Sequence, residues 1–385
     1  MRSRILKHTV LFALGVLLCF AVTLPAKADQ PKFDELSVFL EALRARADVP
    51  ALAAAVIMHG EIKAVRAVGV RKLGEEVRVT VDDQFHLGSC TKSITATLIA
   101  KLVEDDKLTY DTTLAEVFPE LSQNMNEKFR SVTVRHLLSH RAGLPGESSP
   151  AGMTLRQVHA LAGSPREQRL EYTRLMLAAP PTYAPGSRYV YSNAGYAIAG
   201  AIAERVMDTP WETLLAEEIF GPLGITSAGF GAMGTPGRID QPWQHRLADG
   251  KTRPIGPGPL ADNPPAIGPA GTVHMNVADW ARFVADHVNE GKKEGSLLKP
   301  ETYQTIHEAP FGGTYAYGWI VAPRPWANGN ALTHAGSNTM NFAVVWAAPK
   351  RGFAILVMTN VAGDDVAARV DEIVGALIRK YLINR

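Results

Sequence analysis

The chain has 385 residues, of which 46% are hydrophobic and 20% charged, a composition typical of a globular protein with a large core. Its 40 Lys and Arg residues nearly balance 38 Asp and Glu residues, and they form no basic run. Nucleic acid and anionic membrane surfaces are therefore not expected as partners.

The first 28 residues have the pattern of a secretory signal peptide. A basic start precedes an apolar run over 9–24, and a small-x-small cleavage site ends at Ala28. The run is short for a membrane-spanning helix, although an uncleaved anchor is the alternative. Cleavage would leave a domain over 29–385 with Cys90 as its one cysteine, so no disulfide could form within it. We therefore expect a secreted or periplasmic protein, with no stable membrane insertion after cleavage.

Strand patterns occur near both ends of this domain, and helical patterns lie between them. In chain order, the predicted elements are a helix over about 33–46, two strands within 51–70, a helix after residue 86, mostly helical sequence over 132–220, a Gly- and Pro-rich segment over 229–272, a helix near 278–290, four β-rich runs within 317–360, and a helix over about 364–381. This order predicts an α+β fold. One antiparallel sheet flanked by helices would be built from both chain ends, with a mostly helical region of about 86–270 inserted.

The helix near Ser89 carries a lysine on its apolar side. Lys92 lies one turn after Ser89, and at about 100° per residue it falls between Ala96, Ile99 and Val103. Most lysines are solvated at the surface, but the phase of this helix predicts a buried one. A buried lysine beside a serine hydroxyl can accept the proton of that hydroxyl and make it a nucleophile.

Two further motifs follow along the chain. Tyr191 and Asn193 form the only Tyr-x-Asn of the sequence, in a loop before an apolar helix. His334 and Gly336 form a His-x-Gly on a predicted strand. Taken alone, the tyrosine is explained as well by a packed aromatic residue as by a catalyst, and the histidine is better explained as a structural residue.

Taken together and in this order, the three motifs resemble those of the serine β-lactamase and penicillin-binding hydrolase superfamily. The resemblance is strongest to its branch of class C β-lactamases, D-aminopeptidases and esterases (peptidase family S12). The motifs of that branch are Ser-x-x-Lys, Tyr-x-Asn, and Lys-Thr-Gly or His-x-Gly. The segments "VTVRHLLSHRAGLP", "IFGPLGITSAGFG" and "PAGTVHMNVADWARF" are also similar to family sequence. The resemblance implies a β-lactamase/transpeptidase-like fold over the whole mature chain, with no cofactor and no metal.

The resemblance and the chemistry of the residues together assign three catalytic groups. Ser89 would be the nucleophile that forms an acyl-enzyme, Lys92 would accept its proton, and Tyr191 would shuttle the proton to the leaving group. The division of the general-base role between the lysine and the tyrosine is open at this stage. The substrate would be held by Asn193, His334, Gly336 and Ser337, and the backbone N–H groups of Ser89 and Ser337 would form an oxyanion hole.

The histidine of the third motif bears on the substrate. His334 stands where many members of the family have a lysine that holds a substrate carboxylate. A histidine is mostly neutral at pH 7, so we expect it to attract anions only below an apparent pKa of about 6 to 7. This favours an esterase or D-amino-acid peptidase that acts on a small-molecule or peptide acyl donor. The alternatives are a β-lactamase proper and a penicillin- or cell-wall-binding protein that is acylated but turns over poorly.

Three other candidates are weaker. His136 and His140 could bind a metal, but no third ligand is evident, so a structural helix end is expected. The side chain of Cys90 leaves the helix about 100° away from the nucleophile, which favours a core thiol. A second Ser-x-x-Lys at 296–299 lies in a charged stretch and is expected to be a surface loop.

Overall fold

The computed structural model describes residues 33–383, except for positions 147, 151 and 364. The expected signal peptide and its cleavage site lie outside the described residues. The helices and strands are, in order, α1 (Leu36–Ala47), β1 (Ala51–Met58), β2 (Glu61–Gly69), β3 (Phe85–His86), α2 (Thr91–Glu104), α3 (Leu114–Val117), α4 (Val134–Leu138), α5 (Leu155–His159), α6 (Pro165–Ala178), α7 (Asn193–Met207), α8 (Trp211–Leu215), β4 (Gly229–Phe230), β5 (Gln244–Ala248), β6 (Lys251–Ile255), α9 (Gly268–Gly271), β7 (Val273–Met275), α10 (Val277–Asn289), α11 (Pro300–Ile306), β8 (Ile320–Arg324), β9 (Gly329–Ser337), β10 (Phe342–Ala348), β11 (Phe353–Thr359), β12 (Val361–Gly363) and α12 (Val366–Ile378).

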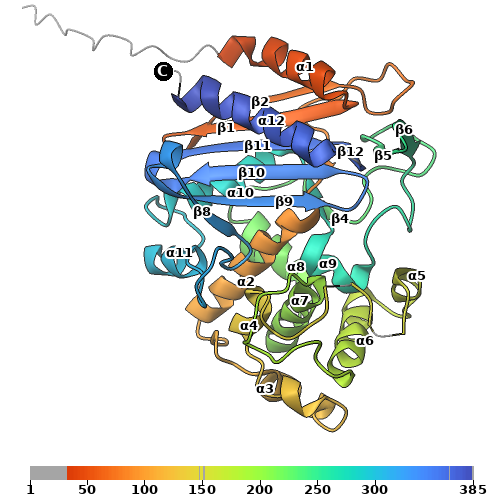
Figure 1. The fold of residues 1–385 in the computed structure, drawn as a ribbon, viewed down its shortest axis with the longest axis vertical. Helices are drawn as coiled ribbons and strands as arrows, with labels where there is room; N and C mark the ends of the chain where they lie inside the picture. The colour runs from red at the N-terminus through yellow and green to blue at the C-terminus, as the bar shows by residue number, and fades with distance from the viewer. Residues whose placement is uncertain (1–32, 147, 151, 364, 384–385) are drawn as a thin grey trace, which may run out of the picture. The chain divides into compact units, whose positions relative to one another are not determined.

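The main sheet joins strands from the two ends of the described chain, as the sequence predicted. Its order is β2-β1-β11-β10-β9-β8, and all neighbours are antiparallel (Figure 1). The central strand β1 is buried along its whole length. Because side chains alternate across a strand, its odd-numbered residues pack into one hydrophobic cluster and its even-numbered residues into another. This explains why the sequence of β1 is apolar throughout rather than alternating.

Helices cover both faces of this sheet. On one face, α12 packs on β10 and β11, and α1 packs beside it on β1 and β2 (Figure 1). The buried residues of α12 recur at helical spacing and form one apolar stripe, namely Val366, Val370, Ile373, Val374 and Leu377. On the other face, α10 packs on β1, β2 and β11. The sheet is therefore the middle layer between two sets of helices.

The inserted region surrounds helix α2. This helix contacts α7, α8, α9 and α11, and 11 of its 14 residues are buried. Its polar residues Ser93 and Thr97 are buried as well, and their hydroxyls donate to the backbone carbonyls of Cys90 and Ser93. A helix that is enclosed on all sides holds its first turn rigidly, and the candidate nucleophile lies directly before that turn.

The Gly- and Pro-rich segment over 229–272 contains more regular structure than its low periodicity indicated. Strands β5 and β6 form a hairpin whose turn residues, Asp249 and Gly250, both have positive φ, which matches the usual Asp-Gly hairpin turn. Strand β7 pairs with β3 and β4 in a small separate sheet. Since β3 runs directly into the turn that carries Ser89, this pairing helps to fix the site. Among the helices of the described residues, none is both long and apolar enough to cross a bilayer.

Candidate active site

Ser89 lies in a short 3-10 helix, Gly88–Cys90, that joins β3 to α2. The sequence pattern placed this serine on the long helix itself, whereas the structure places it one turn before the helix proper. Gly88 has φ of 50°, a left-handed conformation that favours glycine, and a Cβ there would overlap the backbone of Ser337. Glycine thus allows the chain to turn sharply and to press the serine against strand β9.

Strand β9 approaches this turn backbone to backbone. A Cβ on Gly336 would overlap the carbonyl oxygen of Leu87 and would lie 2.6 Å from the backbone nitrogen of Ser89. Only a residue without a side chain allows this approach. The approach brings the backbone of Ser337 to the start of α2, where an oxyanion hole formed with the N–H of Ser89 would require it.

Lys92 is fully buried and its amine has three hydrogen-bonding partners. Its Nζ lies 3.0 Å from Ser89 Oγ, 2.6 Å from Asn193 Oδ1 and 2.8 Å from the carbonyl oxygen of Ala270. Burial holds the pKa of Lys92 well below its usual value. All three partners are uncharged, so no carboxylate among them opposes that shift.

The partners of Lys92 also determine how a neutral amine would be oriented. The amide oxygen of Asn193 and the carbonyl oxygen of Ala270 can only accept, so the two N–H bonds of a neutral amine point to them. The lone pair then faces Ser89, whose hydroxyl can donate to it. This orientation is the one that a general base needs toward a serine nucleophile.

Tyr191 reaches the same hydroxyl from the other side. Its hydroxyl lies 2.7 Å from Ser89 Oγ, and Lys92 Nζ lies 4.8 Å from the centre of its ring. Burial raises the pKa of Tyr191 above its usual value. The phenol is therefore protonated at neutral pH, and it can pass a proton on but is not itself a phenolate base.

Asn193 is the first residue of α7 and links two parts of the site. Its Oδ1 accepts from Lys92, and its Nδ2 donates to the hydroxyl of Ser148 at 2.8 Å. The preceding residue, Ser192, donates its backbone N–H to Nδ1 of His140 at 3.1 Å. These bonds fix the loop that carries the Tyr-x-Asn motif relative to α2 and α4.

His334 lies next to these residues, but its environment differs from the one expected. Its side chain is nearly enclosed, at 3% exposure. Its Nδ1 lies 2.7 Å from the carbonyl oxygen of Ala335, and its Nε2 lies 3.1 Å from the hydroxyl of Tyr315. Burial, with a smaller contribution from Lys92, lowers the pKa of His334 to about 3. The apparent pKa of about 6 to 7 that we expected for anion attraction is therefore wrong, because the imidazole is desolvated.

The structure thus brings the predicted residues together around one hydroxyl. Ser89, Lys92, Tyr191 and Asn193 are joined by hydrogen bonds, and Gly336 packs against the nucleophile's turn. Ser337 ends the same strand beside that turn. The catalytic and substrate-binding roles of these residues stay predictions.

Sequence reasoning missed Tyr315 and His140. The ring of His140 is 4.4 Å from that of Tyr191 and 4.5 Å from that of Tyr315, so it packs directly behind the tyrosine of the second motif. Burial and the nearby Lys92 lower the pKa of His140 far below its usual value. The segment "LLSHRAGLP" had been singled out as similar to family sequence, and its histidine was the available signal. Tyr315 lies in "TYAYGW", where nothing in the pattern distinguished one tyrosine from the other.

The weaker candidates lie elsewhere or serve the fold. Cys90 is buried, and its Sγ lies 3.5 Å from the carbonyl oxygen of His334, as a core thiol would. His136 bonds to Thr133 at the start of α4, and the described part of the chain holds no cluster of three metal-binding side chains. Lys299 of the second Ser-x-x-Lys is 69% exposed, as expected for a surface position.

The fold and the residues gathered around Ser89 are those of a class of proteins that includes β-lactamases and penicillin-binding proteins and whose members are generally serine hydrolases. The family model described as Beta-lactamase matches residues 38–380, and the chain belongs to this family. This confirms the resemblance to the branch of class C β-lactamases and peptidase family S12.

Curated relatives and solved structures agree. Penicillin-binding protein 4 of Amycolatopsis lactamdurans is 28% identical over 336 residues, which cover 83% of each chain. Protein flp of Staphylococcus aureus is 20% identical over 84% of this chain, a match that spans 62% of that protein's length.

The octameric penicillin-binding protein homologue from Pyrococcus abyssi has a TM-score of 0.70 at 22% identity, over 90% of this chain and 77% of that chain. SurE has a TM-score of 0.73 at 21% identity, over 90% and 76%. The similarity of this chain to these solved structures confirms the fold.

Proposed function

We propose that this protein is an exported serine hydrolase that forms an acyl-enzyme at Ser89 and acts on esters or D-amino-acid amides. One observation carries the proposal. Lys92 Nζ and the hydroxyl of Tyr191 both lie within hydrogen-bonding distance of Ser89 Oγ, at 3.0 Å and 2.7 Å. A serine hydroxyl needs an adjacent proton acceptor to become a nucleophile, and here it has an amine on one side that can accept the proton and a phenol on the other that can donate one.

The opposite pKa shifts of the two neighbours support a division of roles. The lowered pKa of Lys92 favours its neutral amine, and this amine takes the proton of Ser89 as Ser89 Oγ bonds to the acyl carbon. The backbone N–H groups of Ser89 and Ser337 would stabilise the oxyanion. Tyr191 keeps its proton until it gives it to the leaving group, and the proton that Lys92 took from Ser89 then restores the phenol. In deacylation, a water molecule bonds to the acyl carbon and gives a proton to the basic groups beside Ser89. Ser89 Oγ takes up a proton as its bond to that carbon breaks, which restores the hydroxyl.

The surroundings of His334 favour neutral acyl donors over those with a carboxylate. The imidazole is buried and uncharged, so it offers no fixed cation to a β-lactam or a D-Ala-D-Ala end. SurE, which shares the fold, has been solved with D-Leu, and that structure is a reason to include D-amino-acid amides among the substrates. The name of the relative from A. lactamdurans supports a second candidate, a penicillin-binding protein that is acylated and deacylates slowly.

Labelling with a fluorophosphonate tests the proposal. The reagent should modify Ser89 alone, and Ser89→Ala should abolish both labelling and hydrolysis. Ser296→Ala is the matched control, since Ser296 begins the second Ser-x-x-Lys, and it should be labelled like the wild type. A label mapped to any other residue, or a fully active Ser89→Ala, would refute the proposal.

A substrate panel then separates the two candidates. We would compare p-nitrophenyl butyrate, nitrocefin and D-leucine p-nitroanilide, and follow both the burst and the steady state. Sustained turnover of the ester or the amide supports the hydrolase. One equivalent of product followed by no steady state with every substrate would instead support the penicillin-binding protein.

A further inference from the structure

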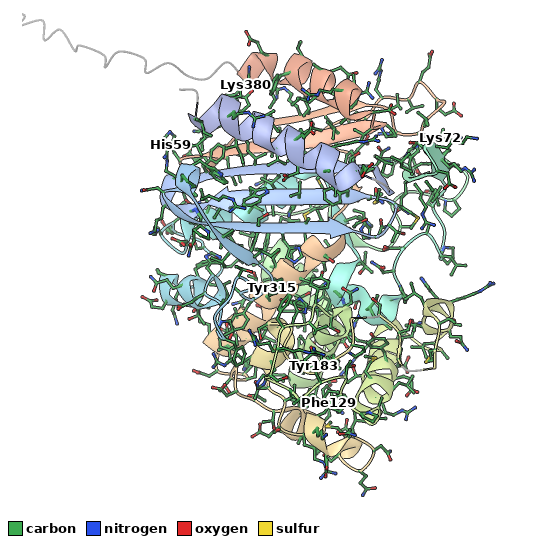
Figure 2. The ribbon with its side chains drawn as sticks, in the orientation of Figure 1. His59, Lys72, Phe129, Tyr183, Tyr315 and Lys380 are labelled. Atoms are coloured by element: carbon green, nitrogen blue, oxygen red, sulfur yellow. The ribbon has the colours of Figure 1, made fainter. Side chains whose placement is uncertain are left out.

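Tyr315 lies where the sheet and the helical region meet (Figure 2). It precedes a tight turn at Gly318, whose φ is 77°. A Cβ on Gly318 would lie 2.6 Å from Cα of Ser93 and 2.7 Å from the carbonyl oxygen of Lys92. The turn is therefore pressed against the first turn of α2, and Tyr315, at 6% exposure, is fixed beside the active site.

The hydrogen bonds of His334 determine which ring nitrogen carries the proton. Nδ1 faces the carbonyl oxygen of Ala335 at 2.7 Å, and a carbonyl can only accept, so Nδ1 carries the proton. In a neutral imidazole Nε2 is then the acceptor, and it faces the hydroxyl of Tyr315 at 3.1 Å. Both ring nitrogens are thus occupied, and neither is available to a substrate.

The groups packed around this pair do not disturb the assignment. Tyr196 donates its own hydroxyl proton to the carbonyl of Leu138 at 2.8 Å, so toward the hydroxyl of Tyr315 it acts as a second acceptor and supplies no proton. Burial raises the pKa of Tyr315 well above its usual value, so its hydroxyl keeps the proton that Nε2 accepts. Lys92 and His140 lie on the adjacent elements, and a positive charge on either would oppose protonation of His334.

We infer that Tyr315 is a positioning residue that determines specificity: by donating to Nε2 it fixes the buried His334 with its proton on Nδ1 and occupies its second ring nitrogen, so that the site selects acyl donors without a negative charge near the third motif. This inference rests on the proposed function and names the substrate class of the same site. A lysine in place of His334 could not accept this bond, so the tyrosine and the histidine act as a pair.

NMR titration of the imidazole tests the inference without any activity. In protein with ¹⁵N-labelled histidine, His334→Gln identifies the signals of His334 among those of the 11 histidines. We expect the wild-type imidazole to stay neutral from about pH 5.5 to 8, with its proton on Nδ1. In Tyr315→Phe burial should still keep the imidazole neutral, whereas the Nε2 signal should move to that of a nitrogen that accepts no hydrogen bond, and an unmoved Nε2 signal would contradict the inference. A wild-type His334 that titrates there, or that carries its proton on Nε2, would overturn the inference.

Kinetics on a matched pair of esters tests the consequence. We would measure kcat/KM for p-nitrophenyl butyrate and for mono-p-nitrophenyl succinate, whose acyl chains have equal length and differ in one terminal carboxylate. The wild-type preference for the neutral ester should not change over this pH range. Tyr315→Phe should improve the relative rate of the anionic ester by up to roughly tenfold at the acid end, because Nε2 is then free to take up a proton beside a bound carboxylate, and the gain has the scale of one charge-assisted hydrogen bond.

Tyr317→Phe is the control, because it removes a hydroxyl from the same turn. The hydroxyl of Tyr317 faces Arg135 at 3.3 Å and makes no hydrogen bond to His334. The ester preference of Tyr317→Phe should therefore equal that of the wild type. An unchanged preference in Tyr315→Phe, or the same change in Tyr317→Phe, would overturn the inference. Failure of the proposed function would be seen separately, as loss of labelling at Ser89, and the titration would still decide the role of Tyr315.

Discussion

Replacing Lys92 with methionine tests whether the folded protein holds this amine neutral. Methionine keeps an unbranched side chain of similar length and removes the titratable group. In the wild type the amine has no exposed surface and only uncharged hydrogen-bonding partners, and burial places its pKa well below 10.5. In the unfolded chain the same amine is solvated and stays protonated to about pH 10. The wild type therefore releases a proton when it folds between these two pKa values, and Lys92→Met does not.

The magnitude follows from the linkage between proton binding and stability. Where the unfolded state binds one proton more than the folded state, the free energy of unfolding rises by about 1.4 kcal/mol per pH unit. Between the folded and the unfolded pKa of Lys92, the wild type should gain this amount per pH unit relative to Lys92→Met. The sign follows from the lowered folded pKa: the stabilisation is complete above the unfolded pKa and is lost as the pH falls toward the folded one.

Urea unfolding of both proteins across this pH range measures the difference. Lys299→Met is a matched control, because it makes the same substitution at the exposed lysine of the second Ser-x-x-Lys. Its unfolding free energy should change with pH in parallel with that of the wild type. If Lys92→Met also ran parallel to the wild type, the folded protein would hold an ammonium there, and the reasoning that makes Lys92 a ready base would be refuted.

Two other substitutions test the remaining parts of the site. Tyr191→Phe should slow acylation of Ser89 by roughly 10²–10⁴, measured as the rate of fluorophosphonate labelling. The double variant Tyr191→Phe/Lys92→Met should be little slower than the slower of the two single variants. If the two single effects multiplied in the double variant, they would contradict a shared proton path. Gly336→Ala should abolish labelling, because its Cβ would overlap Leu87 and displace the N–H of Ser89, whereas an unchanged labelling rate would show that β9 does not shape the oxyanion hole.

Much of the site could be predicted because its residues carry local patterns. The helical phase placed Lys92 on the buried side of its helix, and a lysine without exposed surface is found there. The apolar runs at the two chain ends indicated a shared sheet, and β1 pairs with β11. The first inference rests on periodicity within one helix, and the second on the order of β-rich and helical segments along the chain, both of which the sequence contains directly.

The contacts that set the chemistry were not predictable in the same way. The carbonyl of Ala270 and the hydroxyl of Tyr315 reach the site from segments 178 residues after Lys92 and 19 residues before His334. A strand pattern assigns His334 to a face but does not show that a tyrosine hydroxyl covers it there. The surroundings that lower its pKa therefore became visible only with the fold in place.

The pairing of β1 with β11 determines when the candidate active site can form during synthesis of the chain. Leu52 pairs with Thr359, and Gly336 packs on the turn of Ser89, so both contacts join segments that the ribosome makes hundreds of residues apart. Such pairings have a high contact order and form slowly, and a nascent chain that has not yet reached β9 lacks one wall of the site. Ser89 and Lys92 are thus synthesised long before the site around them can form, and an unfinished polypeptide holds a serine that is not yet in contact with the groups of β9.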